Sequence, residues 1–170
     1  MTPLVAVPHM IITVMGTPCS GKSTAAIRLA KHYGLKHYSI GDLRRKAAAE
    51  KNMTLAEYNE LGETEDTDSH FDDYQKRLGE IEDGFVIDGR LSSFFIPKGI
   101  HVFLDAEEDV RSQRMLTEDA EHERIGERPD NKEDAIALMR RRVESDKKRY
   151  MRHYNFDPYN PDSYKIVLDS

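Results

Sequence analysis

The sequence GTPCSGKST, from Gly16 to Thr24, decides the fold of this chain. It fits the pattern G-x-x-x-x-G-K-S/T, in which glycines let the backbone curl so that its N–H groups point toward an anion. Residues 10–15 before it form an apolar, β-branched run that is typical of a buried strand. Residues 23–33 after it carry apolar side chains at helical spacing. Strand, glycine loop and helix in this order predict a phosphate-binding loop; a chance match in a strand-to-helix turn is the alternative.

Two side chains of the loop suit a bound phosphate chain and its metal ion. We expect the Lys22 ammonium to reach the outer phosphates and the Ser23 hydroxyl to take one position on Mg²⁺. The free amides at the start of the following helix add to the anion site. The loop residues expected to contact the phosphates are Gly16, Thr17, Pro18, Cys19, Ser20, Gly21, Lys22, Ser23 and Thr24.

The composition indicates a single domain without a charge bias toward polyanions. The chain has 170 residues, of which 33% are charged, and its formal net charge is -6. We therefore expect no nucleic-acid partner. No apolar run is long enough to span a membrane, so no membrane partner is expected either. The single cysteine, Cys19, excludes a disulfide framework and favours a reducing, cytoplasmic location.

Apolar runs that read as strands alternate with amphipathic stretches that read as helices. This alternation predicts an α/β fold of three layers, with a five-stranded, mostly parallel sheet covered on both faces. We expect a single domain with its core in residues 10–40, 84–117 and 132–170, a small helical insert at about 41–83, and a polar lid at about 118–131. Within the insert, Thr54 and Glu57 predict a capping box. Residues 62–73 are rich in carboxylates and are expected to be a mobile, solvated connection. The expected strands are residues 10–15, 36–40, 85–87, 100–104 and 164–168.

Charged side chains gather where the predicted strands end, which is where ligands bind in α/β sheets. Arg44, Arg45 and Lys46 follow the second strand, and we favour a phosphate contact for one arginine over a merely solvated helix face. Asp88 ends the third strand, where it could hold Mg²⁺ or accept a substrate proton, or simply cap a helix. Arg90, two residues later, is well placed for a transferred or accepting phosphate.

The last predicted helix, residues 132–153, carries a charged face. Arg142, Asp146 and Arg149 are spaced i, i+4 and i+7, so they lie on one side of the helix. A surface ladder of ion pairs gives the same spacing and is the alternative to a ligand-binding role.

The order of these segments resembles a nucleoside monophosphate kinase, and most of all the short archaeal-type cytidylate kinases. The segments that carry the resemblance are GTPCSGKST, YSIGDLRR (residues 38–45), VIDGR (86–90) and the R-x-x-x-D-x-x-R run from Arg142 to Arg149. The resemblance covers nearly all of the chain from Ile11 to Asp169. The lid segment is longer and more acidic than the family pattern, and no helix follows the last strand.

The resemblance implies that ATP phosphorylates CMP or dCMP to the diphosphate, with Mg²⁺ bound beside the ATP. It implies a monomer, and two lid arginines, Arg124 and Arg128, that also contact ATP. Ser23 and Asp88 would hold the metal. The implied catalytic residues are Lys22, Arg90, Arg142 and Asp146. The implied acceptor-binding residues are Ser39, Asp42, Arg45, Asp72, Arg90 and Arg149, with Arg45 at the position of the phosphate-contacting arginine and Arg44 as an additional charge.

Other functions stay open at this point. The chain could be an adenylate kinase or another phosphate-loop kinase for a small molecule, because the side chains that choose the acceptor lie in the insert and cannot be placed from sequence. It could also be an adenylate-kinase-related ATPase that acts as a switch. Arginines both after the second strand and at Arg90 favour a second phosphate ligand, and hence a kinase.

Overall fold

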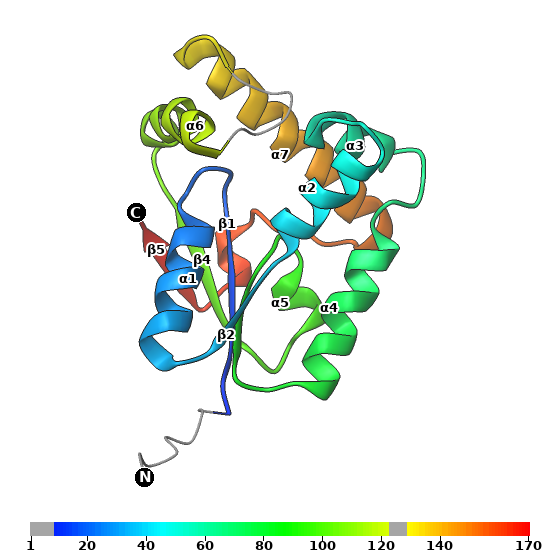
Figure 1. Ribbon diagram of the computed structural model, residues 1–170, viewed down its shortest axis with the longest axis vertical. Coiled ribbons are helices and arrows are strands. Elements are labelled where there is room, and N and C mark those ends of the chain that lie inside the picture. The colour runs from blue at the N-terminus through cyan, green and yellow to red at the C-terminus, as the bar shows by residue number, and fades with distance from the viewer. Residues whose placement is uncertain (1–8, 123–128) are drawn as a thin grey trace.

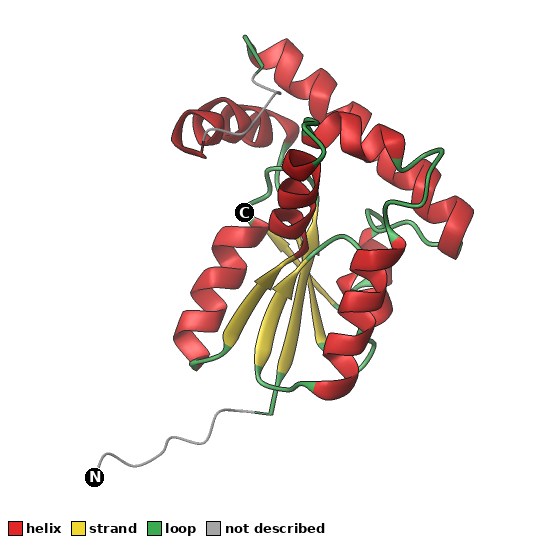
Figure 2. Ribbon diagram, turned by 45° about the vertical axis from the view of Figure 1, so that its right-hand side comes forward, coloured by secondary structure: helices red, strands yellow, loops and turns green. Residues whose placement is uncertain are grey.

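A parallel five-stranded sheet forms the centre of the molecule (Figures 1 and 2). The computed structural model describes residues 9–122 and 129–170. The strand order is β2-β3-β1-β4-β5, and all four neighbouring pairs are parallel, which confirms the predicted sheet. The strands are β1 (Ile11–Gly16), β2 (Lys36–Ser39), β3 (Phe85–Asp88), β4 (Ile100–Asp105) and β5 (Ile166–Asp169).

Helices occupy the connections between the strands. The helix α5 and a short 3₁₀ turn, Pro161–Ser163, were not expected from the sequence. The predicted capping box at α3 is confirmed, because the Thr54 hydroxyl accepts from the Glu57 N–H and the Glu57 carboxylate accepts from the Thr54 N–H. The helices are α1 (Lys22–Tyr33), α2 (Ile40–Glu50), α3 (Leu55–Leu61), α4 (Ser69–Ile81), α5 (Ser92–Phe95), α6 (Glu108–His122) and α7 (Lys132–Tyr154).

The two faces of the sheet are buried against different helices (Figure 2). Successive side chains of a strand point to opposite faces. On β1, Ile12 and Val14 belong to the apolar cluster that contains Ala26 and Ala30 of α1. The neighbouring residue Ile11 instead joins the cluster built from α2, α4 and α5. The edge strand β5 is less covered, and its apolar side chains are between 39% and 50% exposed.

The long helix α7 crosses the carboxyl end of the sheet (Figure 1). It contacts α6 at one end and α3, in the insert, further along. It therefore connects the core to the helical insert. None of the helices in the described ranges, 9–122 and 129–170, combines the length and the apolar character needed to cross a bilayer.

One expectation about the segments between core elements was wrong. Residues 62–73 are not a solvated connection throughout, because α4 begins at Ser69 and the side chains of Asp68 and Asp72 are buried. Their carboxylates are buried because Arg44, Arg149 and Tyr154 reach them. The expected lid, residues 118–131, begins within α6, which continues to His122. The predicted lid arginines, Arg124 and Arg128, lie outside the described residues.

The junction of β1 and the glycine loop depends on Gly16. Its φ is 143°, and a Cβ at this position would lie 1.9 Å from the Leu104 carbonyl oxygen of β4. The neighbouring Thr17 N–H donates to the same oxygen at 3.2 Å, so the loop is held against β4 by its backbone. A side chain at residue 16 would push the loop away from the strand.

We predict that Gly16→Ala lowers the free energy of unfolding by about 3 kcal/mol or more, because backbone atoms must move to make room. Gly34→Ala is the matched control: Gly34 also has a positive φ, 67°, but a Cβ there meets nothing within 4 Å. It should cost only about 1 kcal/mol. Urea unfolding followed by circular dichroism measures both, and equal losses would contradict the steric explanation.

Candidate active site

The loop after β1 curls as the sequence predicts. Cys19 and Gly21 have φ values of 60° and 83°, and Gly21 is the N-cap of α1. Positive φ at these positions turns the backbone back toward the helix N-terminus, where free N–H groups accumulate. Lys22 lies at the first turn, and its ammonium donates to the Thr17 carbonyl oxygen at 2.8 Å. The Lys22 side chain therefore folds back over the loop.

Ser23 and Asp88, the predicted metal ligands, are brought together. The Ser23 hydroxyl donates to Asp88 Oδ1 at 3.0 Å, from α1 to the end of β3. Asp88 also accepts from the Ser39 hydroxyl at 3.2 Å, and its Oδ2 lies 2.7 Å from His37 Nε2. A hydroxyl and a carboxylate oxygen side by side suit Mg²⁺, which prefers few protein ligands together with phosphate oxygens and water. Among the residues that the structure describes, no cluster of three or more His, Cys, Asp or Glu could hold a metal alone.

Lys22 is half-buried and lies close to the guanidinium of Arg90. Burial, together with the nearby charge of Arg90, lowers the pKa of the Lys22 ammonium to about 8. A bound polyphosphate would supply the negative charge that favours the protonated form. The electrostatics of the loop are therefore those of an anion site.

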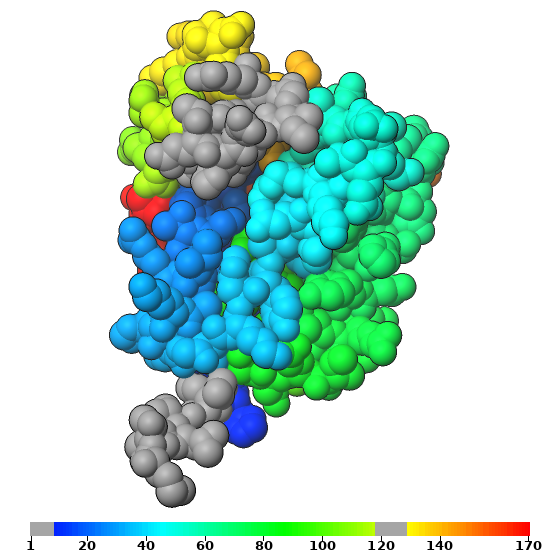
Figure 3. Space-filling view, viewed as in Figure 1, coloured from blue at the N-terminus to red at the C-terminus, as the bar shows by residue number. Residues whose placement is uncertain are grey.

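A cavity of about 290 Å³ lies between the glycine loop and the insert. In Figure 3 the insert, coloured cyan to green, forms one side of the molecule and α1, in blue, lies beside it. The cavity is lined by residues from both, and by the end of β3 and α7. Its charged and polar lining includes Lys22, Ser23, Arg44, Arg45, Asp72, Gln75, Asp88, Arg90 and Arg142.

The two adjacent arginines of α2 have different surroundings. Arg44 is 3% exposed, forms an ion pair with Asp68, and donates from Nη2 to Asn59 Oδ1 at 3.0 Å. Its guanidinium also lies over the rings of Tyr58 and Phe71. Arg45 instead pairs with the exposed Asp42 carboxylate at the edge of the cavity. The sequence interpretation treated Arg44 as an extra charge, but its partners show that it holds the insert together while also lining the cavity.

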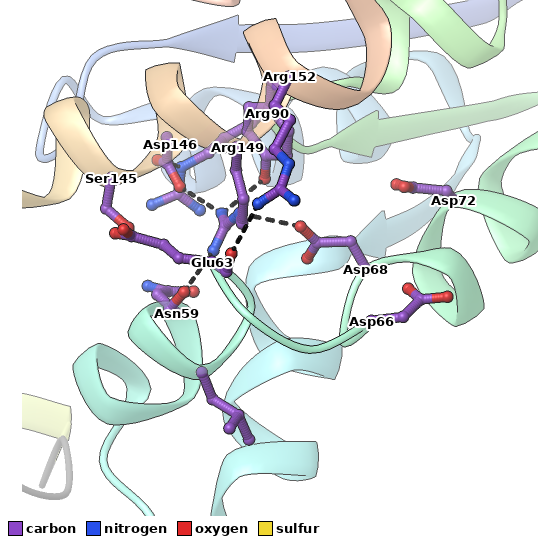
Figure 4. A network of polar contacts seen from close by, with 12 residues as sticks. Asn59, Glu63, Asp66, Asp68, Asp72, Arg90, Ser145, Asp146, Arg149 and Arg152 are labelled. Carbon is purple, nitrogen blue, oxygen red and sulfur yellow. Dashed lines mark hydrogen bonds and ion pairs between the residues drawn. The ribbon is translucent and has the colours of Figure 1, made fainter.

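A buried carboxylate, Asp146, connects α7 to the end of β3 (Figure 4). It forms an ion pair with Arg90 and accepts from Arg149 Nη2 at 2.7 Å. The Tyr159 hydroxyl donates to Asp146 Oδ2 at 2.6 Å and accepts from Arg90 Nε at 3.0 Å. Burial alone would raise the pKa of Asp146, but the Arg90 and Arg149 guanidiniums outweigh it and hold that pKa below its usual value.

Arg149 extends this network into the insert. It is 1% exposed, donates to the Asn59 carbonyl oxygen at 2.8 Å, and lies 2.9 Å from Asp68 Oδ2. Asp146 and Arg149 do not line the cavity. Asp146 and Arg149 instead form a buried network with Arg90 and not a surface ladder, whereas Arg142, on the same side of α7, lines the cavity. Tyr159 and Asn59, which complete it, carry no signal in the sequence.

The remaining predicted acceptor residues divide into two groups. Ser39 and Asp42 do not line the cavity. The Ser39 hydroxyl instead accepts from the Asp42 N–H and caps α2. Asp72 does line it, and its Oδ2 accepts from the Tyr154 hydroxyl. Burial, partly offset by that hydrogen bond, raises the pKa of Asp72 to about 6. Gln75, one turn further along α4, also lines the cavity and was not singled out from the sequence.

Comparison with known proteins places the chain in a family. Residues 11–170 match the model of the cytidylate kinase-like family. The chain belongs to this family. A relative named cytidylate kinase from Methanopyrus kandleri is 34% identical over 95% of this chain and 84% of its own length. Another, from Halorubrum lacusprofundi, is 40% identical over 87% of this chain and 74% of its own length.

Solved structures support the fold of this family member. A shikimate kinase from Bacteroides thetaiotaomicron has a TM-score of 0.60 at 14% identity, covering 94% of this chain and 86% of its own. A gluconokinase from Sinorhizobium meliloti has a TM-score of 0.53 at 18% identity, with 95% and 82% covered. At these identities the likeness shows the phosphate-loop kinase fold alone.

We predict that Asp146→Asn lowers the free energy of unfolding by about 3 to 5 kcal/mol, because Arg90 and Arg149 lose their shared buried counter-charge. The control is Glu144→Gln on the same helix, where an exposed carboxylate lies 4.0 Å from Lys148 and should cost under about 1 kcal/mol. Chemical denaturation of both variants makes the comparison. A loss at Asp146 no larger than at Glu144 would show that the network does not stabilise the fold.

Proposed function

We propose that this chain transfers the γ-phosphoryl group of ATP to CMP or dCMP, with ADP and CDP or dCDP as products. One observation carries the proposal: the glycine loop with Lys22, and the arginines Arg45, Arg90 and Arg142, line the same cavity. An anion site at each side of one cavity suits a reaction in which both substrates carry phosphates. Membership of the cytidylate kinase-like family supports the cytidine nucleotide as acceptor.

The loop side of the cavity would hold the phosphates of ATP. Its backbone N–H groups and the Lys22 ammonium would bind the β- and γ-phosphates. Ser23 and Asp88, whose hydroxyl and Oδ1 lie 3.0 Å apart, would hold Mg²⁺, which would supply positive charge against the phosphates. We place the lid arginines Arg124 and Arg128 near ATP on the family pattern alone.

The arginine side would hold the acceptor. Arg45 and Arg90 would bind the phosphate of the monophosphate, and Arg142 would neutralise charge on the group in transit. Asp146 would position Arg90 through their ion pair, and not touch the substrate. Arg149 and Arg44 would hold the insert in place against α7.

The transfer requires positioning more than covalent chemistry. An oxygen of the acceptor phosphate forms a bond to the γ-phosphorus while the bond from that phosphorus to the β-γ bridging oxygen breaks. The acceptor oxygen is already anionic, so no general base has to remove a proton. Closely spaced cations around the transferred group would stabilise its charge. We propose that the enzyme works as a monomer, as the family pattern implies, and in the cytoplasm, which its single cysteine, Cys19, favours.

The reaction is tested by coupled ADP release with Mg·ATP against CMP, dCMP, UMP, AMP and GMP. We expect turnover with CMP or dCMP, and we expect Lys22→Ala to lower kcat/KM by at least about 10²-fold, because it removes a cation from the reacting phosphates. The control is Lys31→Ala at the exposed far end of α1. Its kcat/KM should equal that of the wild type. Preference for AMP, or ADP release that no monophosphate stimulates, would contradict the proposal.

A further inference from the structure

Two polar side chains of α4, Asp72 and Gln75, face the cavity from the same side of the helix. They are spaced i and i+3, so they are neighbours on the helix surface. Both line the cavity, and both are largely buried, at 7% and 2% exposed. Buried polar groups normally have hydrogen-bond partners, so a polar atom of either side chain that has no partner in the protein is a candidate for a hydrogen bond to a ligand.

Each of the two side chains is held by one partner and keeps one atom available. The Tyr154 hydroxyl donates to Asp72 Oδ2, and the described residues give Oδ1 no hydrogen-bond partner. The Ser92 hydroxyl donates to Gln75 Oε1 at 2.8 Å, and within residues 9–122 and 129–170 nothing accepts from Nε2. These two hydrogen bonds fix which atom of each side chain stays available to a ligand. The cavity is therefore presented with an acceptor, Asp72 Oδ1, beside a donor, Gln75 Nε2.

This acceptor and donor match one edge of cytosine. Cytosine carries an amino donor at N4 beside an acceptor at ring N3, whereas uracil carries an acceptor at O4 beside a donor at N3. Carboxylates accept from cytosine N4 in nucleic-acid recognition for the same reason. Adenine presents the same pair of groups as cytosine. This contact therefore discriminates cytosine from uracil but not from adenine, and discrimination against a purine would have to come from the size of the cavity.

Apolar side chains complete the surroundings of a flat ring. Ile40, Phe71, Leu91 and Tyr150 line the same cavity. Figure 4 shows Asp72 set apart from the cluster of Arg90, Asp146 and Arg149. A nucleotide could thus place its phosphate at the arginines and its base against α4.

We propose that Asp72 and Gln75 read the base of the acceptor: Asp72 Oδ1 accepts from the 4-amino group and Gln75 Nε2 donates to N3, which selects cytidine over uridine monophosphates. This assignment rests on the function proposed above. Tyr154 and Ser92 are positioning residues, because they orient the side chains of Asp72 and Gln75 but do not line the cavity themselves. Ser92 is also fully buried.

Substitutions that exchange single atoms test the assignment. In Asp72→Asn, the Tyr154 hydroxyl holds the amide oxygen, so the amide nitrogen faces the base as a donor. In Gln75→Glu, the Ser92 hydroxyl holds one oxygen and the other faces the base as an acceptor. We expect each change to lower the ratio of kcat/KM for CMP to that for UMP by about 5- to 150-fold, the value of one good base contact. The double variant keeps the charge of the pair and should turn the preference toward UMP.

Matched controls separate base reading from general damage. Asp73→Asn changes the exposed neighbour of Asp72 on α4 and should leave the CMP to UMP ratio unchanged. Tyr154→Phe should lower the ratio by less than Asp72→Asn, because it frees the carboxylate to rotate without removing it. Calorimetric binding of CMP and UMP to wild type and variants provides a readout that needs no turnover, and ATP binding checks that each variant is folded.

The outcomes distinguish this inference from the proposed function. If the wild type phosphorylates CMP but the ratio stays within about twofold in both single variants and the double variant, the base-reading pair is wrong and the kinase function stands. If no monophosphate is phosphorylated, the proposed function fails. The inference then fails as well unless wild type binds CMP more tightly than UMP and Asp72→Asn removes that difference.

Discussion

The buried carboxylate of Asp146 is the contact on which the arrangement of the cavity depends. It meets the guanidiniums of Arg90, from the end of β3, and of Arg149, from α7 itself. Arg149 continues to Asn59 and Asp68 in the insert. One carboxylate therefore connects the sheet, the long helix and the insert. Removing its charge would leave two buried cations close together, which is far more costly than losing an exposed ion pair.

The molecule concentrates positive charge in one place although its net charge is -6. Lys22 and four arginines line a single cavity, and the depressed pKa of Lys22 reflects burial and the repulsion from Arg90. Buried acids limit this repulsion: Asp146 faces Arg90, and Asp68 faces Arg44. The remaining positive charge is directed into the cavity. An anionic ligand would be attracted there and would in turn relieve the repulsion between the side chains that bind it.

The parts of the structure that the sequence predicted are those governed by local pattern or by sheet topology. The glycine loop, the alternation of strands and helices, and the capping box at Thr54 follow from residues near one another in the chain. The contact of Ser23 with Asp88 joins residues far apart, but it follows from the rule that parallel strands bring their carboxyl ends to one edge. These features could be predicted because few arrangements of the chain satisfy them.

The interior of the insert could not be predicted in this way. Residues 62–73 look solvated in sequence because they carry many carboxylates, yet Asp68 and Asp72 are buried by Arg44, Arg149 and Tyr154, which lie up to 82 residues away. For the same reason the sequence could not distinguish the paired, buried Arg44 from Arg45 at the cavity edge. Gln75 gave no signal, because a single amide on an amphipathic helix is ordinary until its neighbours are known.

The central claim is that two phosphate-bearing substrates meet in one cavity, and a bisubstrate analogue tests it most directly. Cytidine and adenosine joined through five phosphates should bind once per chain, and should displace both ATP and CMP in competition calorimetry. A crystal structure of that complex should place the phosphates between Lys22 and Arg90. An analogue that displaces ATP but not CMP, or that binds away from this cavity, would contradict the account.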